Sequence, residues 1–197
     1  MTQQTCSDNH SGEDVTVDTP WLEQRQLRAW IRLRGILELL PGVLDAQLRR
    51  DADVTEFEFY VLAMLSEAPG RTLRMTELAR QTNATLPRLS HVVTRLEGRD
   101  LVERFPCPED RRATNARLTE AGWAKVQAAA PGHVVNVRHH VIDALSAEQI
   151  DQLAGIGAAV LARLDPSGAM AATYTRYDEP PREQAEAEVE EAAREGG

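Results

Sequence analysis

The chain has 197 residues, of which 42% are hydrophobic and 5% aromatic, and a formal net charge of −9 at pH 7. These values predict one helical domain with a core rich in Ala, Leu and Val. The sequence contains no apolar run of the roughly 18 residues that a membrane span requires, and no signal-peptide pattern, so we expect a cytoplasmic protein without a membrane partner. Cys6 and Cys107 are too few for a disulfide framework.

The N-terminal part of the chain predicts a flexible arm over residues 1–20 and a long helix over residues 21–50. Apolar residues follow a broad helical face from Leu22 to Leu48. Pro41-Gly42 predicts a kink or break in this helix. The helix is longer than a small monomeric domain needs.

Three shorter helices are expected next. Thr55-Glu-Phe-Glu58 is a capping box that starts the first of them, and Pro69-Gly70 ends it. Residues 76–80 form a short helix. After a turn, Thr85 caps a third helix that continues to about Arg99. This order is typical of a helix-turn-helix.

The helix that starts at Thr85 is the candidate recognition helix. Its first turn offers backbone donors to a phosphate, and Arg88 and Arg95 can contact guanine edges or phosphates in the major groove. Arg88 is the better candidate for a base contact, because recognition helices enter by their N-terminal turns. For any single arginine, a plain solvated face is an equal alternative. The predicted DNA-facing residues are Thr85, Pro87, Arg88, His91, Thr94 and Arg95.

A β-hairpin follows this helix. Residues 101–105 and 115–118 alternate as two short strands, and prolines 106 and 108 stiffen the loop between them. The loop holds Arg111 and Arg112 at its tip. Two guanidinium groups at a hairpin tip suit a DNA minor groove, where negative potential is concentrated.

The charge is unevenly distributed along the chain. Residues 71–117 contain ten arginines and six acidic residues, a net charge of +4, so the rest of the chain carries −13. Residues 178–197 alone contain eight acidic residues and two arginines. This distribution favours DNA binding by the middle of the chain, and we expect residues 165–197 to be an acidic, disordered tail.

Two further helices are expected near the C-terminus. Thr119 caps the first, in which Pro131-Gly132 predicts an interruption, and the capping box Ser146-Ala-Glu-Gln149 starts the second. Both terminal parts of the chain have more apolar surface than a small winged domain can cover. We therefore expect a homodimer, with packing inside the monomer as the alternative. Two winged domains roughly 34 Å apart would match an inverted-repeat operator.

Several motifs resemble those of the MarR family of winged helix-turn-helix transcriptional regulators over residues 21–164. The most specific are the wing motif and the Leu-Thr-x-x-Gly sequence after it. One departure is Thr85-Leu-Pro-Arg88, where the family often has serines, and another is Asp100, where a glycine is usual. The matching segments are Leu73-Arg-Met-Thr-Glu-Leu-Ala79, Arg95-Leu-Glu97, Leu101-Val-Glu-Arg104, Pro108-Glu-Asp-Arg-Arg112 and Leu118-Thr-Glu-Ala-Gly122.

The resemblance implies a mainly α fold with a small β-hairpin wing. Residues 55–119 would form the winged helix-turn-helix, and residues 21–54 and 120–164 the dimerisation helices. By motif, Arg112 would enter the minor groove, Asp110 would orient the wing and Arg111 would contact phosphate. The implied function is a sequence-specific, double-stranded DNA-binding regulator, a homodimeric repressor that responds to a ligand.

The resemblance also implies a small anionic or aromatic effector, bound between the dimerisation helices and the winged domain. Aromatic residues at helical spacing more often belong to a core than to a pocket. The candidate ligand-binding residues are Trp21, Trp30, Arg34, Phe57 and Tyr60.

Enzymatic and cofactor-dependent functions are not expected. The sequence has no nucleophile elbow, phosphate-binding glycine loop or paired-cysteine motif. Adjacent His139 and His140 point about 100° apart on a helix, which disfavours a metal site with His133. Two alternatives remain: a redox-responsive regulator acting through Cys107, and a winged protein-interaction module that does not bind DNA.

Overall fold

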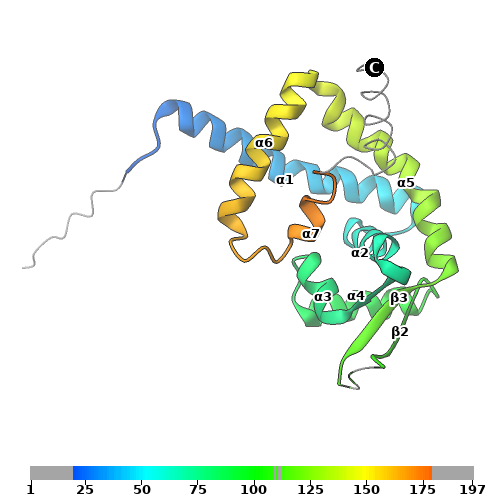
Figure 1. Ribbon diagram of the computed structural model, residues 1–197. Coiled ribbons are helices and arrows are strands. Elements are labelled where there is room, and N and C mark those ends of the chain that lie inside the picture. The colour runs from blue at the N-terminus through cyan, green and yellow to red at the C-terminus, as the bar shows by residue number, and fades with distance from the viewer. Residues whose placement is uncertain (1–19, 109, 111, 179–197) are drawn as a thin grey trace, which may run out of the picture. The chain divides into compact units, whose positions relative to one another are not determined.

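The computed structural model describes residues 20–108, 110 and 112–178 of the protein, and these residues fold into helices and a small antiparallel sheet (Figure 1). The chain divides into two compact units after Glu38, within the first helix. None of the described helices combines the length and hydropathy needed to cross a bilayer. The elements are α1 (Gln24–Ala52), α2 (Glu56–Glu67), β1 (Thr72–Arg74), α3 (Met75–Gln81), α4 (Leu86–Glu97), β2 (Val102–Pro106), β3 (Thr114–Leu118), α5 (Glu120–His140), α6 (Ala147–Leu164) and α7 (Ala171–Tyr174).

The capping boxes define two helix starts where the sequence predicts them. At α2, the Glu58 amide donates to Thr55 Oγ1 at 3.0 Å, and the Thr55 amide donates to Glu58 Oε2 at 2.8 Å. At α6, Ser146 and Gln149 make the same reciprocal pair. Each pair satisfies two amides that the helix itself leaves without acceptors.

The sheet has the strand order β1-β3-β2, with both pairings antiparallel. β2 and β3 form the predicted hairpin, in register from Val102 opposite Leu118 to Pro106 opposite Thr114. β1 was not predicted, because three residues are too few to show alternation. It is held by pairing with β3, where Thr72 lies opposite Arg117. The predicted fold class, mainly helical with a β-hairpin wing, is confirmed.

The main core lies where α2, α3 and α4 meet the sheet. Its members come from one face of each helix, at the spacing expected for amphipathic helices. Fully buried side chains here include Val61, Leu62, Leu65, Leu78, Leu89, Val93, Leu96 and Val102.

Neither helix is broken at its proline, so the interruption predicted in α5 is wrong, and so is the break that was one of the two possibilities for α1. α1 continues through Pro41 and α5 through Pro131. A proline removes one intrahelical hydrogen bond, and packing on its far side can offset that loss. Beyond Pro41, Leu48 is fully buried, and beyond Pro131, Asn136 Nδ2 donates to the Val43 carbonyl at 3.5 Å.

The segment after α6 also differs from the expectation. Residues 165–178, predicted as the start of a disordered tail, form a turn at Asp165 and the short helix α7. The Asp165 carboxylate accepts the amides of Ala169 and Met170 at 2.8 and 2.7 Å, which fixes the turn. Residues 179–197 and the N-terminal arm up to residue 19 lie outside the described residues.

His133 makes stability sensitive to pH. Its ring lies 4.9 Å from that of Phe59, and its Nδ1 is buried with no hydrogen-bond partner among the described residues. Burial lowers the pKa of His133 below its ordinary value. As the pH falls, the unfolded state therefore binds a proton at His133 before the folded state does. The free energy of unfolding keeps its full value above about pH 6.5 and decreases at lower pH.

We expect the His133→Phe variant to lose less stability than the natural protein between pH 7 and pH 5.5. The measurement is the free energy of unfolding in urea at several pH values. His139→Phe is the matched control, since His139 is exposed on the same helix, and it should keep the natural pH dependence. Parallel curves for the natural protein and His133→Phe would contradict the prediction.

Candidate nucleic-acid interface

Helix α4 presents a narrow polar face to solvent. Pro87, His91 and Thr94 are exposed along it, at spacings of three and four residues, while Leu89 and Val93 are buried on the other side. Thr85 caps the helix, because its Oγ1 accepts the Arg88 amide at 3.4 Å. The four predicted residues Thr85, Pro87, His91 and Thr94 therefore lie together on exposed surface.

The two predicted arginines of α4 instead flank this face and contact α2. The Arg88 guanidinium stacks 4.3 Å from the Phe57 ring centroid. Arg95 Nη2 and Nε donate to Glu58 Oε1 at 2.9 and 3.1 Å. Stacking leaves the in-plane N–H groups of Arg88 accessible, whereas Arg95 is already paired with a carboxylate. Of the two, Arg88 keeps more capacity to bind DNA.

Glu58 is only 5% exposed, so its charge depends on its partners. Burial raises the pKa of Glu58, but hydrogen bonds from the Thr55 backbone and from Arg95 more than offset this and leave the pKa below its ordinary value. The carboxylate is thus charged at neutral pH, and Arg95 neutralises it. The sequence did not reveal this pairing, which joins residues 37 positions apart.

The wing is organised by Asp110. Its Oδ1 accepts the Arg112 amide at 3.1 Å, and its carbonyl accepts the Ala113 amide at 2.8 Å. The Cys107 amide donates to the Ala113 carbonyl at 2.9 Å, which closes the turn. Arg112 is exposed and makes no ion pair among the described residues. The other predicted wing arginine, Arg111, lies outside the described residues.

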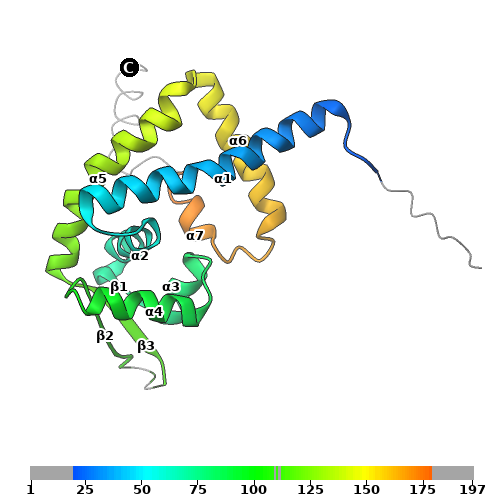
Figure 2. The same cartoon turned by 180° about the vertical axis from the view of Figure 1, so that it is seen from behind.

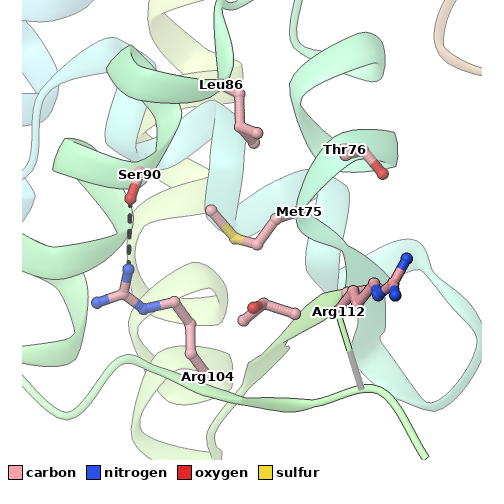
Figure 3. Close-up of a pocket in the computed structure, with 8 residues that line it drawn as sticks. Met75, Thr76, Leu86, Ser90, Arg104 and Arg112 are labelled. Carbon is pink, nitrogen blue, oxygen red and sulfur yellow. Dashed lines mark hydrogen bonds between the residues drawn. The ribbon is translucent and has the colours of Figure 1, made fainter. Parts of the chain in front are cut away.

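A groove of about 220 Å³ separates the start of α4 from the wing. Figure 3 shows Met75 at its centre, Leu86 and Ser90 on the helix side, and Arg104 and Arg112 from the hairpin. The hairpin thus contributes two guanidinium groups, and the helix one hydroxyl, to a single concave surface.

Arg104 and Ser90 are two residues of this surface that the sequence did not single out. Arg104 donates to Glu97 Oε2 at 2.7 Å, to Thr94 Oγ1 at 3.1 Å and to Ser90 Oγ at 3.4 Å. The bond from Arg104 is the largest cause of the lowered pKa of Glu97. Ser90 lies three residues after Pro87 and four before Thr94, a helical spacing that could have identified it.

The residues predicted to bind an effector have varied environments. Trp21 is 85% exposed, and Arg34 forms an ion pair with Glu38 at 2.6 Å. Trp30 is half-exposed. In the second unit, Phe57 and Tyr60 pack against the core, and Tyr60 Oη donates to the Gln81 carbonyl at 3.1 Å. The latter two therefore have packing roles.

Cys107 is buried at the base of the wing, and Arg74 Nη2 donates to its sulfur at 3.4 Å. Burial limits access of an oxidant to the thiol, which weakens the redox alternative. Among the described residues, no three His, Cys, Asp or Glu side chains are grouped as a metal site would require.

Known proteins with similar sequences and structures share this fold. A family model described as the MarR family matches residues 54–114, which include α2 to α4, β2 and the loop that leads to β3. The crystal structure of Sco3205, a MarR family transcriptional regulator from Streptomyces coelicolor in complex with DNA, is 41% identical, with a TM-score of 0.71, over 73% of this chain and 94% of that one. The chain belongs to the MarR family.

Two further relatives are also described as transcriptional regulators or repressors. AbsC, a MarR family transcriptional regulator from Streptomyces coelicolor, is 36% identical with a TM-score of 0.71, over 74% of this chain and 98% of that one. Transcriptional repressor MprA from Escherichia coli (strain K12) is 29% identical over 75% of this chain and 81% of that protein. As a MarR family member, this protein is a DNA-binding transcriptional regulator and not an enzyme.

Proposed function

We propose that this MarR family protein is a ligand-responsive repressor that binds an inverted-repeat operator as a homodimer. The observation that carries the proposal is the groove to which α4 contributes Leu86 and Ser90 and the hairpin contributes Arg104 and Arg112, next to the exposed polar face of the same helix. The names of two relatives support it, since Sco3205 is described in complex with DNA and MprA as a repressor.

Each side of the groove would contact a different part of the duplex. The face formed by Pro87, His91 and Thr94 would enter the major groove, with Ser90 beside it. Arg88 and Arg104 flank this face and would contact phosphates or guanine edges. Arg112 would enter the adjacent minor groove, with Asp110 holding the backbone of the turn.

Exposed apolar residues support the homodimer. Helix α6 has no buried residue, and its Ile156 and Leu164 are 62% and 75% exposed. A monomer rarely exposes such a continuous apolar surface. We propose residues 21–54 and 120–164 as the dimerisation helices. In the first unit, the large exposed apolar residues of α1 are Leu27, Trp30, Ile31, Leu33, Ile36 and Leu37.

Arginine substitutions test the DNA-binding surface. We expect Arg112→Ala to weaken binding to every duplex by about 1–3 kcal/mol per site and to reduce the slope of log affinity against log salt by about one per subunit. Arg88→Ala should instead weaken discrimination between the operator and a scrambled duplex. The measurement is fluorescence anisotropy with an inverted-repeat duplex from the upstream region, over a range of salt concentrations.

Arg50→Ala is the control for this experiment. Arg50 is exposed, pairs with Asp51 near the end of α1, and does not line the groove. Its removal should leave affinity and salt dependence unchanged. Failure of the natural protein to bind any such duplex at low salt would overturn the proposal and favour the protein-interaction module.

A further inference from the structure

The groove between α4 and the wing is basic, whereas the end of the chain is acidic. Among the described residues that line the groove, Arg104 and Arg112 are charged and none is acidic. Glu97 neutralises Arg104, and Arg112 makes no ion pair among the described residues. Residues 179–197, here called the acidic segment, contain seven glutamates and two arginines, a net charge of −5. A duplex and the acidic segment both offer Arg112 a chain of closely spaced negative charges.

Residues 165–178, here called the C-terminal strap, fasten the start of the acidic segment to the helix-turn-helix. On α3, Arg80 donates to two backbone carbonyls of the strap, and the Gln81 carbonyl accepts Thr173 Oγ1 at 3.2 Å. On α2, Glu67 forms an ion pair with Arg176. Figures 1 and 2 both show α7, which belongs to the strap, beside α3. The acidic segment therefore begins close to the DNA-binding elements.

Helix α3 leads from the strap to the groove. The strap binds Gln81 at the end of α3, and Met75 at the start of the same helix lines the groove. These two residues are separated by about 9 Å along the helix axis. The chain from Thr173 to Asp178 adds at most about 18 Å. A chain of nineteen residues extends at most about 65 Å and, as a random coil, about 24 Å. The acidic segment is thus long enough to reach the groove.

We propose that the acidic segment docks in the groove between α4 and the wing when no DNA is bound, and competes with the operator for Arg112. The proposal rests on the proposed function, because this groove is the operator-binding surface of that regulator. The apparent affinity for DNA is then reduced by the fraction of molecules whose groove is occupied. A duplex carries a much higher density of charge, so it displaces the segment.

A tethered segment suits the groove better than a separate acidic protein. The tether raises the effective concentration of the segment at the groove to the order of millimolar, so weak ionic contacts suffice. The segment contains one large apolar residue, Val189, and therefore has little to bury against another surface. Its contacts are consequently ionic and are weakened by salt.

Paramagnetic broadening in the full chain without DNA tests the contact. A spin label is placed at Gly196→Cys in a Cys6→Ser background, and Cys107 is too buried to be labelled. We expect the label to broaden the amide signals of His91 and Arg112 at low salt. The matched control has the same label and length but seven neutral residues, and it should show no broadening. Its substitutions are Glu179→Gln, Glu183→Gln, Glu186→Gln, Glu188→Gln, Glu190→Gln, Glu191→Gln and Glu195→Gln.

Two results of this measurement would overturn the docking. One is the absence of broadening with the natural acidic segment, and the other is equal broadening with the neutral segment. Because the sample contains no DNA, the result does not depend on the operator experiment.

Competition is tested by measuring operator affinity for the unlabelled natural protein and the variant with the neutral segment. At low salt we expect the variant to bind about tenfold more tightly, because its groove is always open. The difference should fall below about twofold at high salt, where ionic contacts are screened.

Equal affinities at low salt would overturn the competition. Tighter binding by the variant without broadening in the natural protein would indicate long-range repulsion of DNA and would overturn the docking. If neither protein binds any duplex, the operator proposal fails and the competition fails with it, whereas the broadening still decides whether the segment docks.

Discussion

Replacing Gly122 with alanine should destabilise the protein by about 3 kcal/mol, the upper end for overpacked sites. A Cβ at this position would lie 2.1 Å from the Leu101 carbonyl oxygen and 2.6 Å from Leu118 Cδ1. The nearer atom belongs to the backbone and cannot move aside as a side chain can. The expected result is a lower urea midpoint with an unchanged slope.

The hydrogen bonds of Thr119 explain why the start of α5 lies so close to Leu101. Thr119 Oγ1 caps α5 by accepting the Gly122 amide at 2.9 Å and donates to the Asp100 carbonyl at 2.6 Å. The Thr119 amide donates to the Leu101 carbonyl at 3.1 Å. Thr119 therefore ties the helix to the chain before β2, and only a glycine fits at the contact. The Leu-Thr-x-x-Gly motif thus has a physical basis in this fold.

Gly98→Ala is the control for this substitution. Gly98 ends α4 with an ordinary φ of −62°, and an added Cβ would come no closer than 3.6 Å to the atoms around it. Its effect should stay within about 1 kcal/mol, since alanine loses less conformational entropy on folding. Equal destabilisation by the two substitutions would mean that the contact at Gly122 relaxes without cost.

Local signals made much of the fold predictable from the sequence. Thr55, Thr85 and Ser146 cap the helices that the sequence assigns to them, and residues 102–106 and 114–118 form the expected hairpin. Features set by distant contacts were not predictable. β1 exists through its pairing with β3, and the position of the segment after α6 against α3 depends on Arg80, which binds the carbonyls of Gly168 and Ala169.

The candidate site shows the same division. The composition of α4 and the wing motif indicated which elements would form it. The positions of the arginines in the sequence could not show that Arg88 stacks on Phe57 or that Arg95 pairs with Glu58. These contacts depend on how α2 crosses α4. Arg104 was missed for the same reason, since its partners lie on a different element.

Arg95→Ala should destabilise the protein by about 2 kcal/mol, because it leaves the buried Glu58 carboxylate without its counter-ion. The effect is below the range for fully buried pairs, since Arg95 is partly exposed and the Thr55 amide remains bound to Glu58. In the natural protein the pKa of Glu58 is lowered, so its contribution is present above about pH 4.3 and is lost as the pH falls. In the variant this loss should begin at higher pH.

A second substitution separates stability from DNA binding. Glu58→Gln in the Arg95→Ala background removes the buried charge while the amide oxygen can still accept the Thr55 backbone N–H. We expect this double variant to recover most of the lost free energy of unfolding, because no buried carboxylate is left without a counter-ion. Comparing the single and double variants with the natural protein isolates the contribution of the pair. If Arg95 serves only to neutralise Glu58, the double variant will bind the operator as tightly as the natural protein. If Arg95 also contacts DNA, stability will recover while affinity stays reduced, because the guanidinium that would reach the duplex is absent from both variants.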